Sequence, residues 1–203
     1  MKAALFFVGA MVSLVPIQAS AAVDIYISDT GANSLVQVLG SLNLSGFTKI
    51  TPNGTEPGSG LIQGRNGILF TGDPRQGLQA YTGLTNNNSF GGFNTAFASS
   101  GTGTGFGING VYPLPRLLLA TTYTSGAPIN STATFANNSI DDIGLTRGTY
   151  VYASTSDTIT LHIGQSAPAV PEPASWGMMI LGMGLVGGAM RRSRAVRTNR
   201  RLA

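Results

Sequence analysis

Along the middle of the chain, short stretches place an aliphatic residue at every second position, and this alternation constrains the fold more than any other feature. In the stretch 158–163, Ile159, Leu161 and Ile163 alternate with two threonines and a histidine, and residues 23–28 follow the same pattern. Successive side chains of a β-strand point to opposite faces, so a period of two predicts strands with one buried face. The middle of the chain is therefore expected to form sheets rather than a helical bundle.

Glycines divide the alternating stretches into short segments. Gly31, Gly54, Gly72 and Gly110 stand where turns between strands are expected. Helical periodicity is not sustained anywhere in this part of the sequence. The one helical turn that we predict lies at 139–143, where a serine precedes two acidic residues that suit a helix N-terminus.

Many short strands joined by turns predict an all-β fold, namely a single antiparallel β-sandwich or barrel-like domain over residues 22–165. The stretch 86–107 is rich in glycine, asparagine and threonine. A composition of this kind is typical of segments without regular structure, so we expect a mobile loop or irregular edge there.

The first 21 residues have the three parts of a secretory signal peptide. Lys2 supplies the positive charge, residues 3–15 form the apolar core, and small residues follow. Ala19 and Ala21 fit the shallow subsites of signal peptidase, which predicts cleavage after Ala21. The expected partners at this end are the Sec translocon and signal peptidase.

Residues 174–190 carry no charge, and arginines follow them at once. Seventeen helical residues span roughly 25 Å, just short of a hydrocarbon core of about 30 Å, so this segment predicts a marginal transmembrane helix. Arg191, Arg192 and Arg194 are expected to act as a stop-transfer cluster that stays in the cytoplasm. The body of the protein then lies on the outer side of the inner membrane.

Pro171, Glu172 and Pro173 precede that apolar segment, and the two prolines hold the tripeptide extended. With the glycine- and methionine-rich helix and the arginines, the region resembles a PEP-CTERM sorting signal over roughly residues 169–194, within a C-terminal region that we place at 166–203. The resemblance implies recognition by exosortase, a membrane transpeptidase. It also implies a membrane-anchored precursor that is later delivered to the cell surface or the extracellular space. A permanent C-terminal anchor with a proline-rich hinge is the alternative.

The formal charge of +4 belongs mainly to the tail, because six of the twelve basic residues lie in the last thirteen positions. The stretch 23–170 holds five basic and seven acidic residues and is therefore close to neutral. A nucleic-acid-binding protein should carry its positive charge on the folded domain, so nucleic acid is not an expected partner. The absence of cysteine excludes disulfides, thiolate metal sites and a cysteine nucleophile.

Few residues in the middle of the chain point to catalysis. His162 is the single histidine and is expected to face solvent from a late strand. Asp141 and Asp142 could begin a calcium site, although acids at a helix start more often interact with the helix dipole. Glu56 is the one glutamate between residues 23 and 170, which leaves little for acid–base chemistry. We therefore assign no catalytic, cofactor-binding or metal-binding residue and expect no cofactor.

The leading hypothesis is an exported, non-enzymatic surface or extracellular-matrix protein. The resemblance implies association with an envelope that produces exopolysaccharide, and so with a biofilm. A second hypothesis is a carbohydrate-binding module, which predicts exposed aromatic residues on one sheet face; the candidates are Tyr26, Tyr123, Tyr150 and Tyr152. A hydrolase using scattered aspartates is the third, and it requires two carboxylates in one cleft.

Overall fold

The computed structural model describes residues 22–50, 55–57, 60–86, 89–111, 115–168 and 180–186. Within these ranges the chain forms fourteen β-strands, one 3-10 turn, η1 (Leu44–Gly46), and a short helix over residues 180–186. It divides into two compact units, Met1–Ser166 and Ala167–Ala203, and all the strands belong to the first. The predicted all-β fold is confirmed.

Sheet A contains six strands in the spatial order β13 (Gly148–Ala153), β14 (Thr158–Ile163), β1 (Ala22–Thr30), β2 (Asn33–Ser41), β12 (Pro128–Phe135) and β9 (Ser100–Gly103). The two alternating stretches of the sequence lie side by side as β1 and β14, with Ile25 opposite Leu161. This pair is parallel, whereas the other pairs of sheet A are antiparallel as expected. A parallel pair needs a long connection, and β1 and β14 are the first and last strands of the unit.

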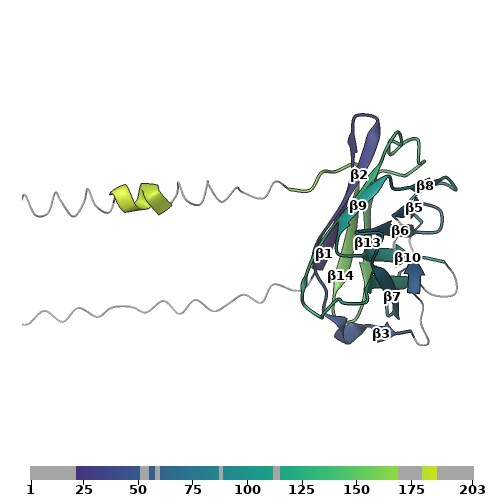
Figure 1. Ribbon diagram of the computed structural model, residues 1–203, viewed down its shortest axis with the longest axis horizontal. Helices are drawn as coiled ribbons and strands as arrows, with labels where there is room; N and C mark the ends of the chain where they lie inside the picture. The colour runs from purple at the N-terminus through teal and green to yellow at the C-terminus, as the bar shows by residue number, and fades with distance from the viewer. Residues whose placement is uncertain are drawn as a thin grey trace, which may run out of the picture. The chain divides into compact units, whose positions relative to one another are not determined.

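Sheet B contains β3 (Thr48–Lys49), β7 (Gly77–Thr82), β11 (Arg116–Ala120), β10 (Phe106–Asn109), β6 (Ile68–Thr71), β5 (Leu61–Gln63) and β8 (Thr95–Phe97) in that spatial order, with β4 (Thr55–Pro57) also paired to β7. Its pairs are all antiparallel. The two sheets form the two layers of the body, with β1, β14 and β2 in one layer and β5, β6 and β10 in the other (Figure 1).

One hydrophobic core fills the space between the sheets. The two sheets contribute fully buried side chains to the same cluster, among them Ile25, Val38, Leu161, Leu69, Phe106 and Leu117. A polar link crosses this core, because the hydroxyl oxygens of Thr71 in β6 and Ser131 in β12 lie 2.7 Å apart and both residues are fully buried. The shared core explains why one face of each alternating strand is apolar, as in a β-sandwich.

The stretch 86–107, which we expected to be a mobile loop or irregular edge, contains β8, β9 and the start of β10, so a loop is wrong, whereas β8 and β9 do lie at the edges of sheets B and A. Its glycines permit close packing of backbone. A Cβ atom at Gly101 would lie only 2.3 Å from the carbonyl oxygen of Gly72. The side chains of Thr102 and Thr132 pair across β9 and β12 at 2.8 Å. The biased composition therefore reflects tight packing at a sheet edge.

The helical turn predicted after β12 forms, because the amide of Ile143 donates to the carbonyl of Ser139 at 3.1 Å. Ser139 and Asp142 make a capping box: the amide of Asp142 donates to the serine hydroxyl at 3.1 Å, and the amide of Ser139 donates to the carboxylate at 3.0 Å. Gly144 ends the turn with φ of 72°, and its amide and that of Leu145 bond back into the turn as in a Schellman motif.

The second unit is described at residues 167–168 and 180–186, and the latter are helical and lie inside the segment 174–190 where we predicted a membrane helix. Its five large apolar side chains are 59 to 70% exposed: Ile180, Leu181, Met183, Leu185 and Val186. Among the described residues, no helix combines the length and the apolar character needed to cross a membrane.

Candidate functional site

The residues predicted to direct export and sorting lie outside the described residues. They are Ala19 and Ala21 at the predicted signal-peptide cleavage site, Pro171, Glu172 and Pro173 of the tripeptide, and Arg191, Arg192 and Arg194 of the stop-transfer cluster. The structure therefore describes the folded body and one short helical part of the C-terminal segment.

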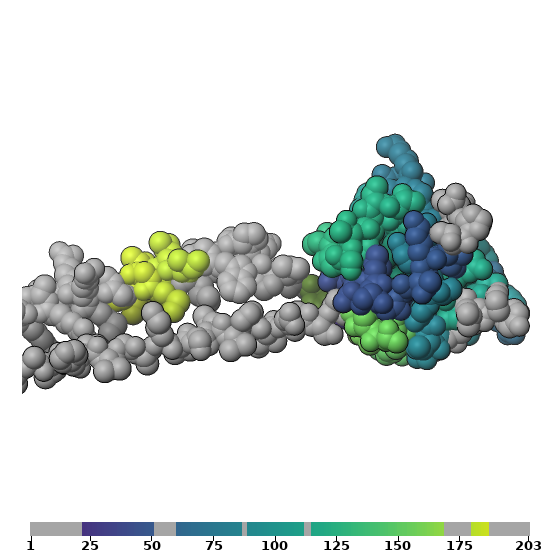
Figure 2. Space-filling view, turned by 90° about the horizontal axis from the view of Figure 1, so that it is seen from below, coloured from purple at the N-terminus to yellow at the C-terminus, as the bar shows by residue number. Residues whose placement is uncertain are grey.

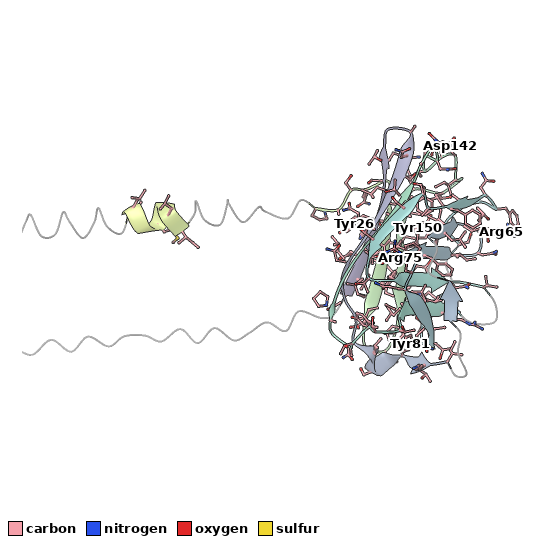
Figure 3. The ribbon with its side chains drawn as sticks, in the orientation of Figure 1. Tyr26, Arg65, Arg75, Tyr81, Asp142 and Tyr150 are labelled. Atoms are coloured by element: carbon pink, nitrogen blue, oxygen red, sulfur yellow. The ribbon has the colours of Figure 1, made fainter. Side chains whose placement is uncertain are left out.

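The four tyrosines proposed as a carbohydrate-binding surface do not gather on one sheet face, so that expectation is wrong. Tyr152 is fully buried, and its burial raises the pKa of its hydroxyl well above the usual range. Tyr150 packs against the core and meets Phe90 edge to face, with ring centres 6.0 Å apart. Tyr123 is partly buried in the same core, and Tyr26 lies on the outer side of sheet A (Figure 3).

The outer face of sheet A carries a polar row that crosses all six strands. In this row each residue lies directly opposite the next on the neighbouring strand: Thr149, His162, Tyr26, Gln37, Thr132 and Thr102. On β14, β1, β2 and β12 the residues before and after each member of the row are buried in the core, so the large aliphatic side chains next to the row lie on the inner face of the sheet. The row offers hydroxyl, amide and imidazole groups on the outer face of sheet A.

His162 is placed on the outer face, as predicted, but it is partly covered rather than open to solvent. Its ring stacks on Tyr26 with a centroid distance of 4.8 Å, and its Nε2 lies 3.2 Å from a carboxylate oxygen of Asp24. The histidine side chain is 19% exposed, and its buried Nδ1 has no partner among the described residues. Partial burial and, to a lesser degree, the charge of Asp24 raise the pKa of Tyr26.

Asp141 and Asp142, considered as the start of a calcium site, are both engaged by protein groups. Asp141 pairs with Arg147, which also contacts Asp29 at 3.1 Å. Hydrogen bonds from the side chain and then the backbone of Ser139 lower the pKa of Asp142. The bond to Asp141 and its charge raise the pKa of Arg147. In the part of the chain that the structure describes, no three His, Asp or Glu residues cluster as metal ligands would.

A pocket of about 390 Å³ opens where the ends of the two sheets meet the segment 120–128. Its lining contains threonines, amides and one aromatic ring and no charged residue: Gln76, Gly103, Thr104, Ala120, Thr122, Tyr123, Thr124, Ala127, Pro128 and Asn130. The carboxylate pair that a hydrolase requires is therefore not part of this lining. Sequence reasoning missed the pocket, because scattered threonines and an asparagine carry no motif that would single them out.

Three segments that are distant in the sequence meet beside this pocket. The amide of Gly126 donates to the carbonyl of Leu42 at 2.8 Å, and the hydroxyl of Ser156 donates to the carbonyl of Asn43 at 2.9 Å. In the space-filling view these segments lie next to one another on the surface of the body (Figure 2). The wall of the pocket is thus fixed by long-range hydrogen bonds.

Comparison with known proteins gives one match. No curated protein and no solved structure matches the chain. A family model described as the PEP-CTERM protein-sorting motif matches residues 169–194, which is the range expected from the tripeptide, the apolar helix and the arginines. The chain therefore carries a PEP-CTERM protein-sorting motif at its C-terminal end, over residues 169–194.

Proposed function

We propose that this is an exported protein whose C-terminal segment is a sorting signal for exosortase and whose β-rich body is the part delivered to the cell surface. The match of residues 169–194 to the PEP-CTERM protein-sorting motif carries the proposal. Helical residues 180–186 support it, because apolar side chains exposed around a helix suit a membrane better than water.

The division of the chain supports separate roles for its two parts. The hydrophobic core lies between residues 23 and 163, so the body keeps its whole core if the chain is cut near Pro171. Before cleavage the precursor is held in the inner membrane by the segment 174–190, with Arg191, Arg192 and Arg194 on the cytoplasmic side. The Sec translocon and signal peptidase act on the other end, with cleavage after Ala21.

In this proposal the delivered body is a non-enzymatic component of the surface or the extracellular matrix, associated with exopolysaccharide. The support is indirect: the stretch 23–170 is near neutral in charge, and no carboxylate or histidine lines the described pocket. A permanently anchored envelope protein is the second candidate, and the exposed apolar residues 180–186 are equally compatible with it.

Mass spectrometry of the exported protein distinguishes the two candidates. In cells with exosortase we expect a C-terminus trimmed close to Pro171, and in cells without exosortase we expect the arginine-rich tail to remain. Replacing Pro171, Glu172 and Pro173 together by alanine should leave the tail in place even when exosortase is present. The matched control is Pro168→Ala, which changes a proline outside the tripeptide and should still be trimmed. An intact tail in every strain would refute sorting by exosortase.

A further inference from the structure

The pocket beside segment 120–128 has a wall that is already held in place. The phenolic oxygen of Tyr123 accepts from the amide of Leu42 at 2.9 Å and lies 2.8 Å from the carbonyl oxygen of Ala127. The side chain of Gln76 accepts from the amide of Gly105 at 2.7 Å. Since these polar groups are satisfied by the backbone, Tyr123 offers a ligand mainly its ring surface. A fixed wall lowers the entropy that binding would cost.

The same pocket also contains polar groups that are free to bind. Among the described residues, the side chains of Thr122, Thr124 and Asn130 have no hydrogen-bond partner, and all three residues are exposed. Two hydroxyls and one amide supply both donors and acceptors. They come from two elements, the segment after β11 and the first half of β12.

These features restrict the class of ligand. No lining residue is charged, so a phosphorylated or acidic ligand would lack the cation that such groups require. A purely apolar ligand would leave the threonine and asparagine groups unpaired, which disfavours its binding. A ring face beside neutral hydroxyl and amide groups suits a sugar, which presents C–H groups on one face and hydroxyls at its edge. The volume of about 390 Å³ lies within the range of small-molecule sites and leaves room for one or two sugar rings.

The surroundings favour a polymer over a free sugar. Asn130 is followed on the same outer face of sheet A by Thr132, whose hydroxyl lies 2.8 Å from that of Thr102. The polar row of this face continues from there across the sheet to Thr149. We infer that this pocket binds a sugar unit of a neutral polysaccharide, whose chain continues over the adjoining face of sheet A. The inference rests on the proposed association of the body with exopolysaccharide and names the chemistry of that partner, but it does not depend on how the protein is sorted.

The test uses the exported protein, purified from the cells that make it, with dextran, hydroxyethylcellulose and a panel of other neutral glycans as probes and alginate as an acidic comparison. Affinity electrophoresis and calorimetry measure binding. The double variant Thr124→Ala with Asn130→Ala should lose roughly tenfold or more in affinity for the neutral polymer that binds, because it removes two hydrogen-bonding groups. The matched control is Thr48→Ala, an exposed threonine of β3 in sheet B that belongs neither to the pocket lining nor to the polar row, and it should change affinity less than about threefold.

Thermal unfolding of each variant checks that the body remains folded, since all the exchanged side chains are exposed. Binding to none of the neutral glycans overturns the inference, and so does binding to alginate alone. Equal affinity of the double variant and the original protein overturns it as well. None of these results depends on how the C-terminus is processed, which mass spectrometry of the exported protein measures separately.

Discussion

The phenolic oxygen of Tyr123 accepts a hydrogen bond from the backbone amide of Leu42 at 2.9 Å, across 81 positions of sequence. The same oxygen lies 3.2 Å from the carbonyl of Leu42 and 2.8 Å from that of Ala127. Tyr123→Phe keeps the ring but leaves the backbone amide of Leu42, a fully buried residue, without its hydrogen-bond acceptor. We expect the free energy of unfolding to fall by about 1–3 kcal/mol in urea denaturation.

The matched control for that substitution is Tyr26→Phe. The hydroxyl of Tyr26 has no hydrogen-bond partner in the described part of the chain, and the ring keeps its stacking on His162 in the variant. Its free energy of unfolding should therefore change by less than about 0.5 kcal/mol. Equal losses in the two variants would mean that the hydrogen bonds of Tyr123 do not stabilise the body.

Gly91 and Gly144 lie next to each other, and replacing either one by alanine should destabilise the protein, but for different reasons. At Gly91 a Cβ atom would lie 2.5 Å from the carbonyl oxygen of Gly144, so Gly91→Ala must move backbone and should cost about 3 kcal/mol or more. At Gly144 a Cβ would meet nothing closer than 3.7 Å, but φ is +72°, so Gly144→Ala should cost only about 1–2 kcal/mol. Thermal unfolding compares the two variants.

Gly144→Asn refines the comparison, because asparagine tolerates positive φ better than alanine does. This variant should be more stable than Gly144→Ala by a few tenths of a kcal/mol or more. If Gly91→Ala proved the milder of the two alanine variants, the close approach of the backbones at Gly91 would not be a constraint on the fold.

Asp29 and Asp141 share Arg147, but they differ in what else they bind. The carboxylate of Asp29 also accepts from the amide of Ile140 at 2.8 Å, so it fixes the helical turn against the end of β1. The side chain of Asp141 is 72% exposed, and its pair with Arg147 is a surface ion pair. Asp29→Ala should lower the free energy of unfolding by about 1–3 kcal/mol, and Asp141→Ala by less than about 1 kcal/mol.

High salt provides a check on this pair of predictions in urea denaturation. Salt screens the exposed ion pair but has little effect on the hydrogen bond from the amide of Ile140. The difference between the variants at Asp29 and Asp141 should therefore persist at 1 M salt. A difference that disappears in salt would show that the role of Asp29 is electrostatic alone.

The strands could be predicted from the sequence because one face of each is buried in a common core. Ile159 and Ile25 alternate with polar residues, and the structure buries both of them in that core. The parallel pairing of β1 with β14 was not predictable in this way, because alternation indicates which face is buried but not which strand is the neighbour. The strands within 86–107 were missed because glycines such as Gly101 pack closely without a hydrophobic pattern.

The functional sites also differ in how far the sequence predicts them. The sorting motif was predictable because its parts are contiguous and chemically distinct, and its family model matches the expected residues 169–194. The contact of His162 with Asp24 joins residues 138 positions apart, and the pocket is lined by residues from 76 to 130. Such sites exist only once the strands are in register. No local pattern of the sequence indicates them.

Alkaline pH should destabilise the body, mainly through the fully buried Tyr152. Burial raises the pKa of Tyr152 well above the ordinary tyrosine value of 10.0 and raises the pKa of Tyr81 and Tyr123 in the same direction. The unfolded chain therefore releases these protons at lower pH than the folded one. The contribution of Tyr152 is complete below about pH 10 and declines as the pH rises above it, by up to about 1.4 kcal/mol per pH unit, whereas the partly exposed Tyr81 and Tyr123 contribute less.

Tyr152→Phe isolates the contribution of one of these groups. Phenylalanine does not ionise, so above pH 10 the free energy of unfolding of the variant should decline with pH less steeply than that of the original protein. Urea denaturation at intervals between pH 8 and pH 12 measures the two slopes, and only the slopes are compared, because the substitution also changes contacts at neutral pH. Parallel curves through that range would mean that the hydroxyl of Tyr152 titrates alike in the folded and unfolded chains, which full burial in a core does not allow.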